Sequence, residues 1–172
     1  MVVKKEYQSY RIAVIGLGYV GLPLLIEFSK KFFSVGFDTS LERIQELING
    51  NDKTNEITDK KKLKNIKFTS QTSDINDCNI FVVTVPTPVK KNNSPDLSPI
   101  KNATKLVAKI LKPQDIIIYE STVYPGVTEE VCVPILEKYS GLKLNKDFGC
   151  GYSPERINPS DKVHTLTNIT KV

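Results

Sequence analysis

A glycine-rich turn is the feature of this chain whose residue types and spacing are best suited to chemistry. It contains Gly16, Gly18 and Gly21 and lies between the apolar runs 12–15 and 22–28. Three glycines spaced in this way, after a strand and before a helix, are typical of a turn that binds the pyrophosphate of a dinucleotide. Backbone N–H groups and the positive end of the helix dipole then face the anion.

An acidic residue follows at the distance that this motif predicts. Residues 32–37 are expected to form a strand, and Asp38, which ends it, lies 20 residues after Gly18. A carboxylate there accepts hydrogen bonds from the adenosine ribose hydroxyls and repels a 2′-phosphate, so we predict NAD rather than NADP as cofactor. Arg43 lies five residues further on. Its spacing leaves open whether it reaches the cofactor or is a solvated helix arginine.

Apolar runs separated by polar turns predict strands that alternate with helices. The expected strands are residues 12–15, 32–37, 66–69, 80–85, 115–119 and 148–152. The expected helices are 22–28, a segment capped by Thr39 or Ser40 that ends near 48, 99–111, and 128–139 with Thr128 as cap and Pro134 as a bend. This alternation is typical of an α/β fold of the Rossmann type, a doubly wound parallel sheet with strand order 3-2-1-4-5-6. Ligands of such sheets bind beyond the carboxyl ends of the strands.

The composition is that of one domain. The chain has 172 residues, 40% of them hydrophobic, which is enough for one core. We assign this domain to residues 11–172, behind a polar lead-in of residues 1–10. No run approaches the ~18 to 20 apolar residues of a membrane span, and no secretory leader opens the chain. We therefore expect a cytoplasmic protein with no membrane partner.

Charge and cysteine content argue against two further classes of site. The net charge is +5, but the densest lysine group, at 60–67, has no interleaved aromatic residues. We therefore expect no nucleic-acid partner, although the positive field favours anionic small molecules. The cysteines Cys78, Cys132 and Cys150 lack metal-ligand spacing, so we expect core thiols and no metal site.

Four segments, taken in order, carry a resemblance to a known family. They are Gly16 to Pro23, Val85 to Pro88, Glu120 to Gly126 and Gly151 to Arg156. Together they resemble the UDP-glucose/GDP-mannose dehydrogenase family, from about Tyr10 to the C-terminus. The sequences of the later segments, YPGVTEE at 124–130 and PERINP at 154–159, are most similar to those of the UDP-N-acetylhexosamine 6-dehydrogenases that supply uronic acids for bacterial surface polysaccharides.

The resemblance implies a reaction and a set of site residues. Family members oxidise the C6 alcohol of a nucleotide sugar, here a UDP-sugar, to a carboxylate with two NAD molecules in succession. The resemblance implies a catalytic role for Thr122, which holds a water or the nicotinamide edge. It also implies a catalytic role for Glu155, which handles proton transfer when a covalent thioester is hydrolysed. The alternatives are a strand-end threonine that satisfies local backbone and a loop carboxylate paired with Arg156. The implied cofactor contacts are Gly16, Gly18, Tyr19, Val20, Gly21, Asp38, Arg43, Thr87 and Thr122.

The chain also departs from the family pattern. The nucleophilic cysteine of the family and its lysine and asparagine partners belong to later segments, and Pro159 and Ser160 stand where other branches have a second acidic residue. We therefore expect a fragment of a longer, homo-oligomeric enzyme, inactive alone because the central helix and the nucleotide-sugar domain are absent. Two other interpretations stay open: a β-hydroxyacid dehydrogenase-like domain and a stand-alone NAD-sensing module.

Overall fold

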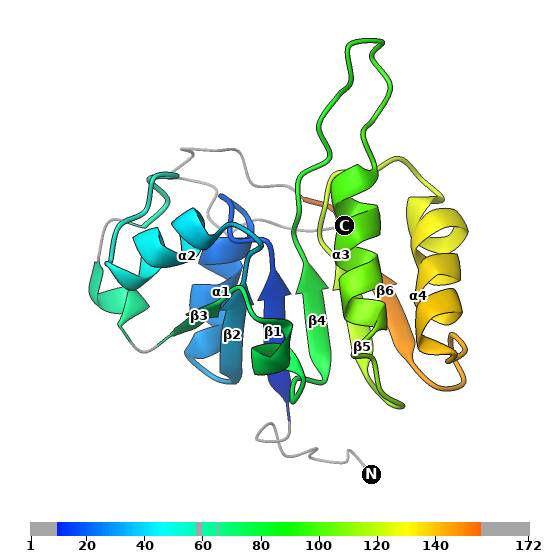
Figure 1. Cartoon of the computed structure of the whole chain (residues 1–172), viewed down its shortest axis with the longest axis horizontal. Coiled ribbons are helices and arrows are strands. Elements are labelled where there is room, and N and C mark those ends of the chain that lie inside the picture. Colours follow the sequence, from blue (N-terminus) through cyan, green and yellow to red (C-terminus); the bar gives the residue numbers. More distant parts are fainter. Residues whose placement is uncertain (1–9, 58–59, 65, 156–172) are drawn as a thin grey trace.

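The six predicted strands pair side by side into one parallel sheet, in the order β3-β2-β1-β4-β5-β6 (Figure 1). This is the predicted order. The structure is a computed structural model and describes residues 10–57, 60–64 and 66–155. The strands are β1 (Arg11–Ile15), β2 (Phe33–Phe37), β3 (Lys67–Thr69), β4 (Ile80–Val83), β5 (Ile116–Tyr119) and β6 (Gly149–Tyr152).

Helices cover both faces of this sheet, which makes it doubly wound as predicted (Figure 1). One face carries α1 (Gly21–Ser29) and α2 (Leu41–Ile48), and the other carries α3 (Ser98–Ala108) and α4 (Val133–Ser140). Short helical segments are η2 (Lys60–Leu63), η3 (Thr72–Ile75) and the π-helical turn η4 (Val127–Cys132). Among the described residues, no helix is long and apolar enough to cross a membrane.

Alternation along the central strand divides the core between the two faces. Ala13 and Ile15 join the apolar cluster beneath α3 and α4, whereas Ile12 and Val14 join the cluster beneath α1 and α2. Successive side chains of a strand point to opposite faces, so a strand covered on both sides must be apolar throughout. This requirement explains why the central strands β1 and β4 are almost entirely apolar in the sequence.

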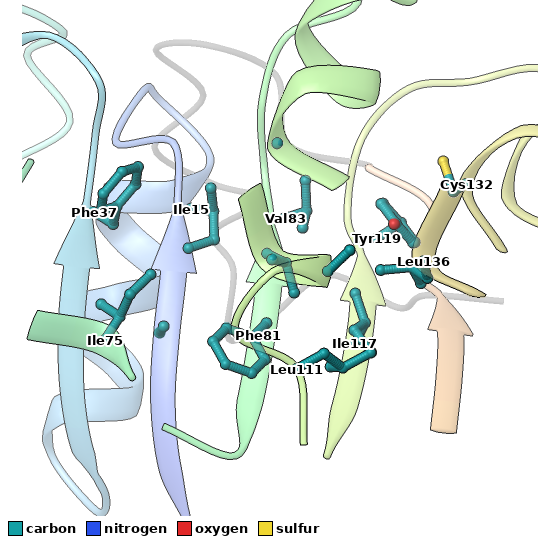
Figure 2. Packing of buried hydrophobic residues seen from close by; sticks show 14 of the residues in the cluster. Ile15, Phe37, Ile75, Phe81, Val83, Leu111, Ile117, Tyr119, Cys132 and Leu136 are labelled. Atoms are coloured by element: carbon teal, nitrogen blue, oxygen red, sulfur yellow. The ribbon is translucent and has the colours of Figure 1, made fainter. Parts of the chain in front are cut away.

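The cluster on the α3 and α4 face includes the thiols of Cys78 and Cys132, and Figure 2 labels Cys132. Cys78 and Cys132 are buried and Cys150 is half-buried, which confirms the prediction of core thiols. Burial raises the pKa of the Cys78 thiol to about 11 and that of Cys150 to about 12. Burial also raises the pKa of the Cys132 thiol, so all three are poor nucleophiles in the folded chain.

One predicted cap is wrong. Thr128 does not begin a helix; it is buried inside η4, and the residue before that turn is Gly126, with a φ of +94°. Pro134 explains the π-helical turn, because it has no N–H to offer the Glu130 carbonyl and its ring would crowd that group in an α-helix. Of the two candidate caps for α2, the structure selects Ser40, whose Oγ accepts the Arg43 N–H at 3.2 Å.

Candidate functional site

The glycine turn joins the end of β1 tightly to the start of α1. Gly16 has a φ of +97°, a conformation that favours glycine, and its N–H donates to the Phe37 carbonyl at 2.8 Å. A Cβ on Gly21 would lie 1.9 Å from the Gly16 carbonyl oxygen and 2.4 Å from Thr84 Oγ1. Only glycine therefore allows α1 to approach β1 and β4 this closely.

The middle of the turn is open. Gly18 and Tyr19 are exposed, and no atom lies within 4 Å of the position that a Cβ on Gly18 would occupy. Within the described part of the chain, no group accepts a hydrogen bond from the N–H of either residue. These donors at a helix N-terminus are suited to an anion such as a pyrophosphate.

Asp38 stands beside this turn, at the end of β2. Its Oδ2 accepts the Leu17 N–H at 2.9 Å, and its Oδ1 accepts the Ser40 N–H at 2.9 Å. The carboxylate is therefore fixed at both oxygens by backbone donors. A carboxylate oxygen can accept more than one hydrogen bond, so each oxygen of Asp38 can still accept one from a ligand hydroxyl.

Arg43 is not the solvated helix arginine that the sequence left open. The residue is buried, with 4% of its surface exposed, and its Nε donates to the Leu17 carbonyl at 2.8 Å. It lines the cleft described below and backs the glycine turn. Contact between its guanidinium and a cofactor stays a prediction.

Hydroxyl groups tie the ends of neighbouring strands together. Thr84 Oγ1 donates to the Gly16 carbonyl at 2.7 Å, and Ser121 Oγ donates to the Val85 carbonyl at 2.8 Å. Both side chains are buried, so they serve the framework of the site. They fix the turn after β1 to the end of β4, and the end of β4 to the end of β5.

Thr87 and Thr122 meet across the loops that follow β4 and β5. The hydroxyl of Thr87 donates to the carbonyl of Thr122, although the two residues are 35 positions apart. Thr122 is exposed and lines the cleft, and its catalytic role stays a prediction.

The loops at the carboxyl ends of β1, β2, β4, β5 and β6 enclose one cleft of about 570 Å³. This volume is within the range of cofactor sites, and the cleft lies where the strand order reverses, between β1 and β4. The predicted site residues that line it are Gly16, Gly18, Tyr19, Val20, Asp38, Arg43, Thr87, Thr122 and Glu155. Gly21 does not line the cleft and packs beneath it instead.

Lining residues that were not predicted as site residues include Lys53, Thr54, Thr84, Glu120 and Ser121. For Thr84, Glu120 and Ser121, their place at the end of a parallel strand was a usable signal. Lys53 and Thr54 come from a polar loop after α2 that carries no local signal. Glu120 is buried, and one carboxylate oxygen of Glu120 and one of Glu155 are buried at the cleft.

A second hollow of about 430 Å³ adjoins the first on the α3 side. Gly16, Asp38 and Pro86 line both hollows, and apolar residues such as Ala103 and Leu106 form the far wall of the second. Asp38 thus lies where the cleft meets a second hollow whose surface is mostly apolar. This combination fits a ligand that has both a sugar and a flat ring.

The chain matches a family model over residues 10–172, described as the NAD binding domain of the UDP-glucose/GDP-mannose dehydrogenase family. It is 56% identical over 162 residues to protein CapL of Staphylococcus aureus, covering 94% of this chain and 38% of CapL. It is 54% identical over 167 residues to UDP-N-acetyl-D-glucosamine 6-dehydrogenase of Pseudomonas aeruginosa, covering 96% of this chain and 40% of that enzyme. The chain thus spans about two fifths of the length of these curated relatives.

Solved structures agree with this match. The structure of UDP-D-ManNAc dehydrogenase from Pyrococcus horikoshii superposes with a TM-score of 0.81 and 36% sequence identity, covering 87% of this chain and 37% of that one. The two structures therefore share one fold over that part.

Proposed function

Because the chain belongs to the UDP-glucose/GDP-mannose dehydrogenase family and matches its NAD binding domain, we propose that it is the NAD-binding part of a UDP-sugar 6-dehydrogenase. The observation that carries this proposal is the meeting of the glycine turn, Asp38, Thr122 and Glu155 at one cleft. Residues from five strand ends are brought together there. A β-hydroxyacid dehydrogenase-like domain is no longer favoured, given the family match.

The cofactor is NAD, and the residues at the cleft fit it. The open N–H groups of Gly18 and Tyr19 suit the pyrophosphate, and the carboxylate of Asp38 suits the ribose hydroxyls. The apolar hollow beside Asp38 suits the adenine ring. When bound, NAD supplies the hydride acceptor for oxidation of an alcohol.

We propose a UDP-N-acetylhexosamine as the substrate, oxidised at C6 from alcohol to carboxylate with two NAD per sugar. The support is the 54% identity to a UDP-N-acetyl-D-glucosamine 6-dehydrogenase. The nucleotide-sugar site and the nucleophilic cysteine would lie in the part of the relatives that this chain does not span. A cytoplasmic location and a homo-oligomeric full-length enzyme stay predictions.

Thr122 and Glu155 are the proposed catalytic residues of this chain. Both line the cleft, and Oε2 of Glu155 is buried there. Glu155 would exchange a proton with the water that releases the carboxylate product, since a carboxylate is suited to general acid–base work. Thr122 would hold that water or the nicotinamide edge through its hydroxyl. Arg156, the partner considered for Glu155, lies outside the described residues.

A chimera tests the proposed function. Residues 10–172 of this chain replace the matching region of the Pseudomonas aeruginosa enzyme, and NADH formation is followed with UDP-N-acetyl-D-glucosamine. We expect the chimera to form two NADH per sugar. The isolated chain should bind NAD but form no NADH with any UDP-sugar.

Two outcomes would overturn the proposal. One is an inactive chimera that folds, binds NAD and still accepts the sugar. The other is sustained NADH production, proportional to protein, by the isolated chain. A chain that binds NAD while its folded chimera stays inactive would favour the NAD-sensing module.

A further inference from the structure

The guanidinium of Arg43 is held on three sides. Besides the Nε bond to the Leu17 carbonyl, one terminal nitrogen donates to Glu46 Oε1 at 2.9 Å and the other to Asp52 Oδ1 at 2.8 Å. The side chain of Arg43 is 5% exposed and that of Asp52 is 2% exposed. Arg43 thus connects the glycine turn to the loop that follows α2.

The charges around Arg43 do not favour a role in attracting phosphate. Two carboxylates, Glu46 and Asp52, lie at ion-pair distance from Arg43, and Glu46 also pairs with Lys53 Nζ at 3.8 Å. The charge of Arg43 is therefore fully compensated before any ligand arrives. What remains specific is the direction of its three hydrogen bonds, since a guanidinium is a rigid planar group.

Asp52 sets that direction because the loop holds it firmly. Its Oδ1 also accepts the Thr54 Oγ1–H at 2.6 Å, and its Oδ2 accepts the N–H groups of Glu56 and Ile57 at 3.0 Å each. Burial acts to raise the pKa of Asp52, but hydrogen bonds from Thr54, Arg43 and the backbone outweigh it and lower the pKa below its ordinary value. The carboxylate stays ionised and in place at neutral pH.

The Leu17–Gly18 peptide is the point at which this arrangement reaches the site. The N–H of Leu17 is bound by Asp38 and its carbonyl by Arg43, so neither side of Leu17 is free to rotate. The peptide that follows is trans, and in a trans peptide the carbonyl and the N–H point in opposite directions. With the Leu17 carbonyl aimed at Arg43, the Gly18 N–H must point away from Arg43.

We propose that Arg43 and Asp52 are positioning residues for the cofactor. Asp52 holds Arg43, and Arg43 holds the Leu17–Gly18 peptide in the orientation that presents the Gly18 N–H to the pyrophosphate. This inference rests on the proposed function, because it takes NAD as the ligand. It assigns to Arg43 an effect through the backbone in place of direct contact with a phosphate.

The test uses Asp52→Asn, which keeps the size of the side chain, and Arg43→Lys, which keeps the charge. Glu137→Gln is the control, because the Glu137 carboxylate likewise accepts hydrogen bonds from a cationic side chain, that of Lys143, and from a backbone N–H, but on α4 away from the cleft. Dissociation constants are measured for NAD and for adenosine by calorimetry and by NMR titration. We expect both site variants to bind NAD about tenfold more weakly or worse.

Adenosine separates positioning from general damage. Adenosine has no pyrophosphate, so its binding does not use the Gly18 N–H. Its affinity should therefore change by less than about twofold in all three variants. The amide signal of Gly18 should also move in both site variants without ligand and stay in place in Glu137→Gln. Thermal melting shows whether each variant folds. If Asp52→Asn does not fold, Arg43→Lys carries the test alone.

A direct phosphate contact predicts the opposite pattern. In that case Asp52→Asn would free the guanidinium and leave NAD affinity equal or higher, and Arg43→Lys would keep most of it. Either result with folded protein would overturn the inference. A wild-type chain that binds no NAD would instead overturn the proposed function, so the two failures are distinguishable.

Discussion

Asp38 is hydrogen-bonded to the glycine turn: its Oδ2 accepts the backbone N–H of Leu17 at 2.9 Å, across 21 residues of sequence. The two parts of the dinucleotide motif therefore form one unit in the folded chain. Because the N–H of Leu17 belongs to the Gly16–Leu17 peptide, Asp38 fixes the first peptide of the turn.

Removing the Asp38 carboxylate should weaken NAD binding and reduce the preference for NAD. We expect Asp38→Ala to cost about 1 to 3 kcal/mol of NAD binding free energy, the range for hydrogen bonds to a charged group. NADP should lose less, because the repulsion of its 2′-phosphate is also removed. Calorimetry with both cofactors measures this, with Asp77→Ala as a control, since Asp77 is exposed and does not line the cleft. Wild-type protein that binds NADP as tightly as NAD would contradict the prediction.

An added methyl group should lower the stability of the fold at Gly21 but leave it nearly unchanged at Gly18. Gly21→Ala places a Cβ 1.9 Å from the Gly16 carbonyl oxygen, so we expect a loss of about 3 kcal/mol or more in the free energy of unfolding. Gly18→Ala meets no atom within 4 Å, so stability should stay within about 0.5 kcal/mol of wild type. Urea denaturation measures both changes.

NAD titration of the same pair completes the comparison. The methyl group of Gly18→Ala would stand in the open part of the turn, where a pyrophosphate approaches the backbone. We expect NAD affinity to fall about tenfold or more in this stable variant. Unchanged NAD affinity in Gly18→Ala would mean that the turn does not hold the pyrophosphate.

Asp115 should make the folded chain less stable as the pH rises. Burial raises the pKa of this carboxyl above its ordinary value near 3.8, despite the Lys112 N–H that it accepts at 2.8 Å. A raised pKa in the folded state means that ionisation opposes folding. Stability is then highest below the ordinary carboxyl pKa and falls as the pH passes the raised value.

Asp115→Asn isolates this effect, because asparagine can still accept the Lys112 N–H but carries no charge. We expect the variant to be more stable than wild type at pH 7, and the difference to vanish at about pH 3, below the ordinary carboxyl range. Thermal melts across this pH range measure it. A variant that is less stable than wild type at pH 7 would show that the charge of Asp115 is not a cost to folding.

In the chimera, Glu155→Gln should slow the release of product more than the first oxidation. A glutamine keeps the size of Glu155 but cannot accept a proton, so steps that activate water should slow by about 10² to 10⁴-fold. Rapid mixing should give a burst of NADH followed by a slow phase, and intact-mass spectrometry should detect the accumulated sugar adduct. Loss of the burst itself, or a steady state like that of the parent chimera, would rule out this role.

Much of the fold could be predicted because its signals are local. Strands covered on both faces must be apolar along their whole length, and such runs, separated by helical segments, leave few ways to connect a parallel sheet. The strand order followed from these runs together with the glycine turn. Thr128 was misplaced because a cap depends on where the backbone turns, and here Pro134, six residues later, decides this.

The sequence by itself determined the cofactor turn and its acidic partner, since Gly16, Gly18, Gly21 and Asp38 have a spacing that only a few geometries explain. Only the tertiary structure decided what surrounds them. Asp52 reaches Arg43 through a polar loop with no periodic pattern, and Thr84 lies under Gly21 because β4 pairs with β1. Such contacts depend on how separate segments pack in three dimensions, and packing between distant segments leaves no spacing in the sequence to read.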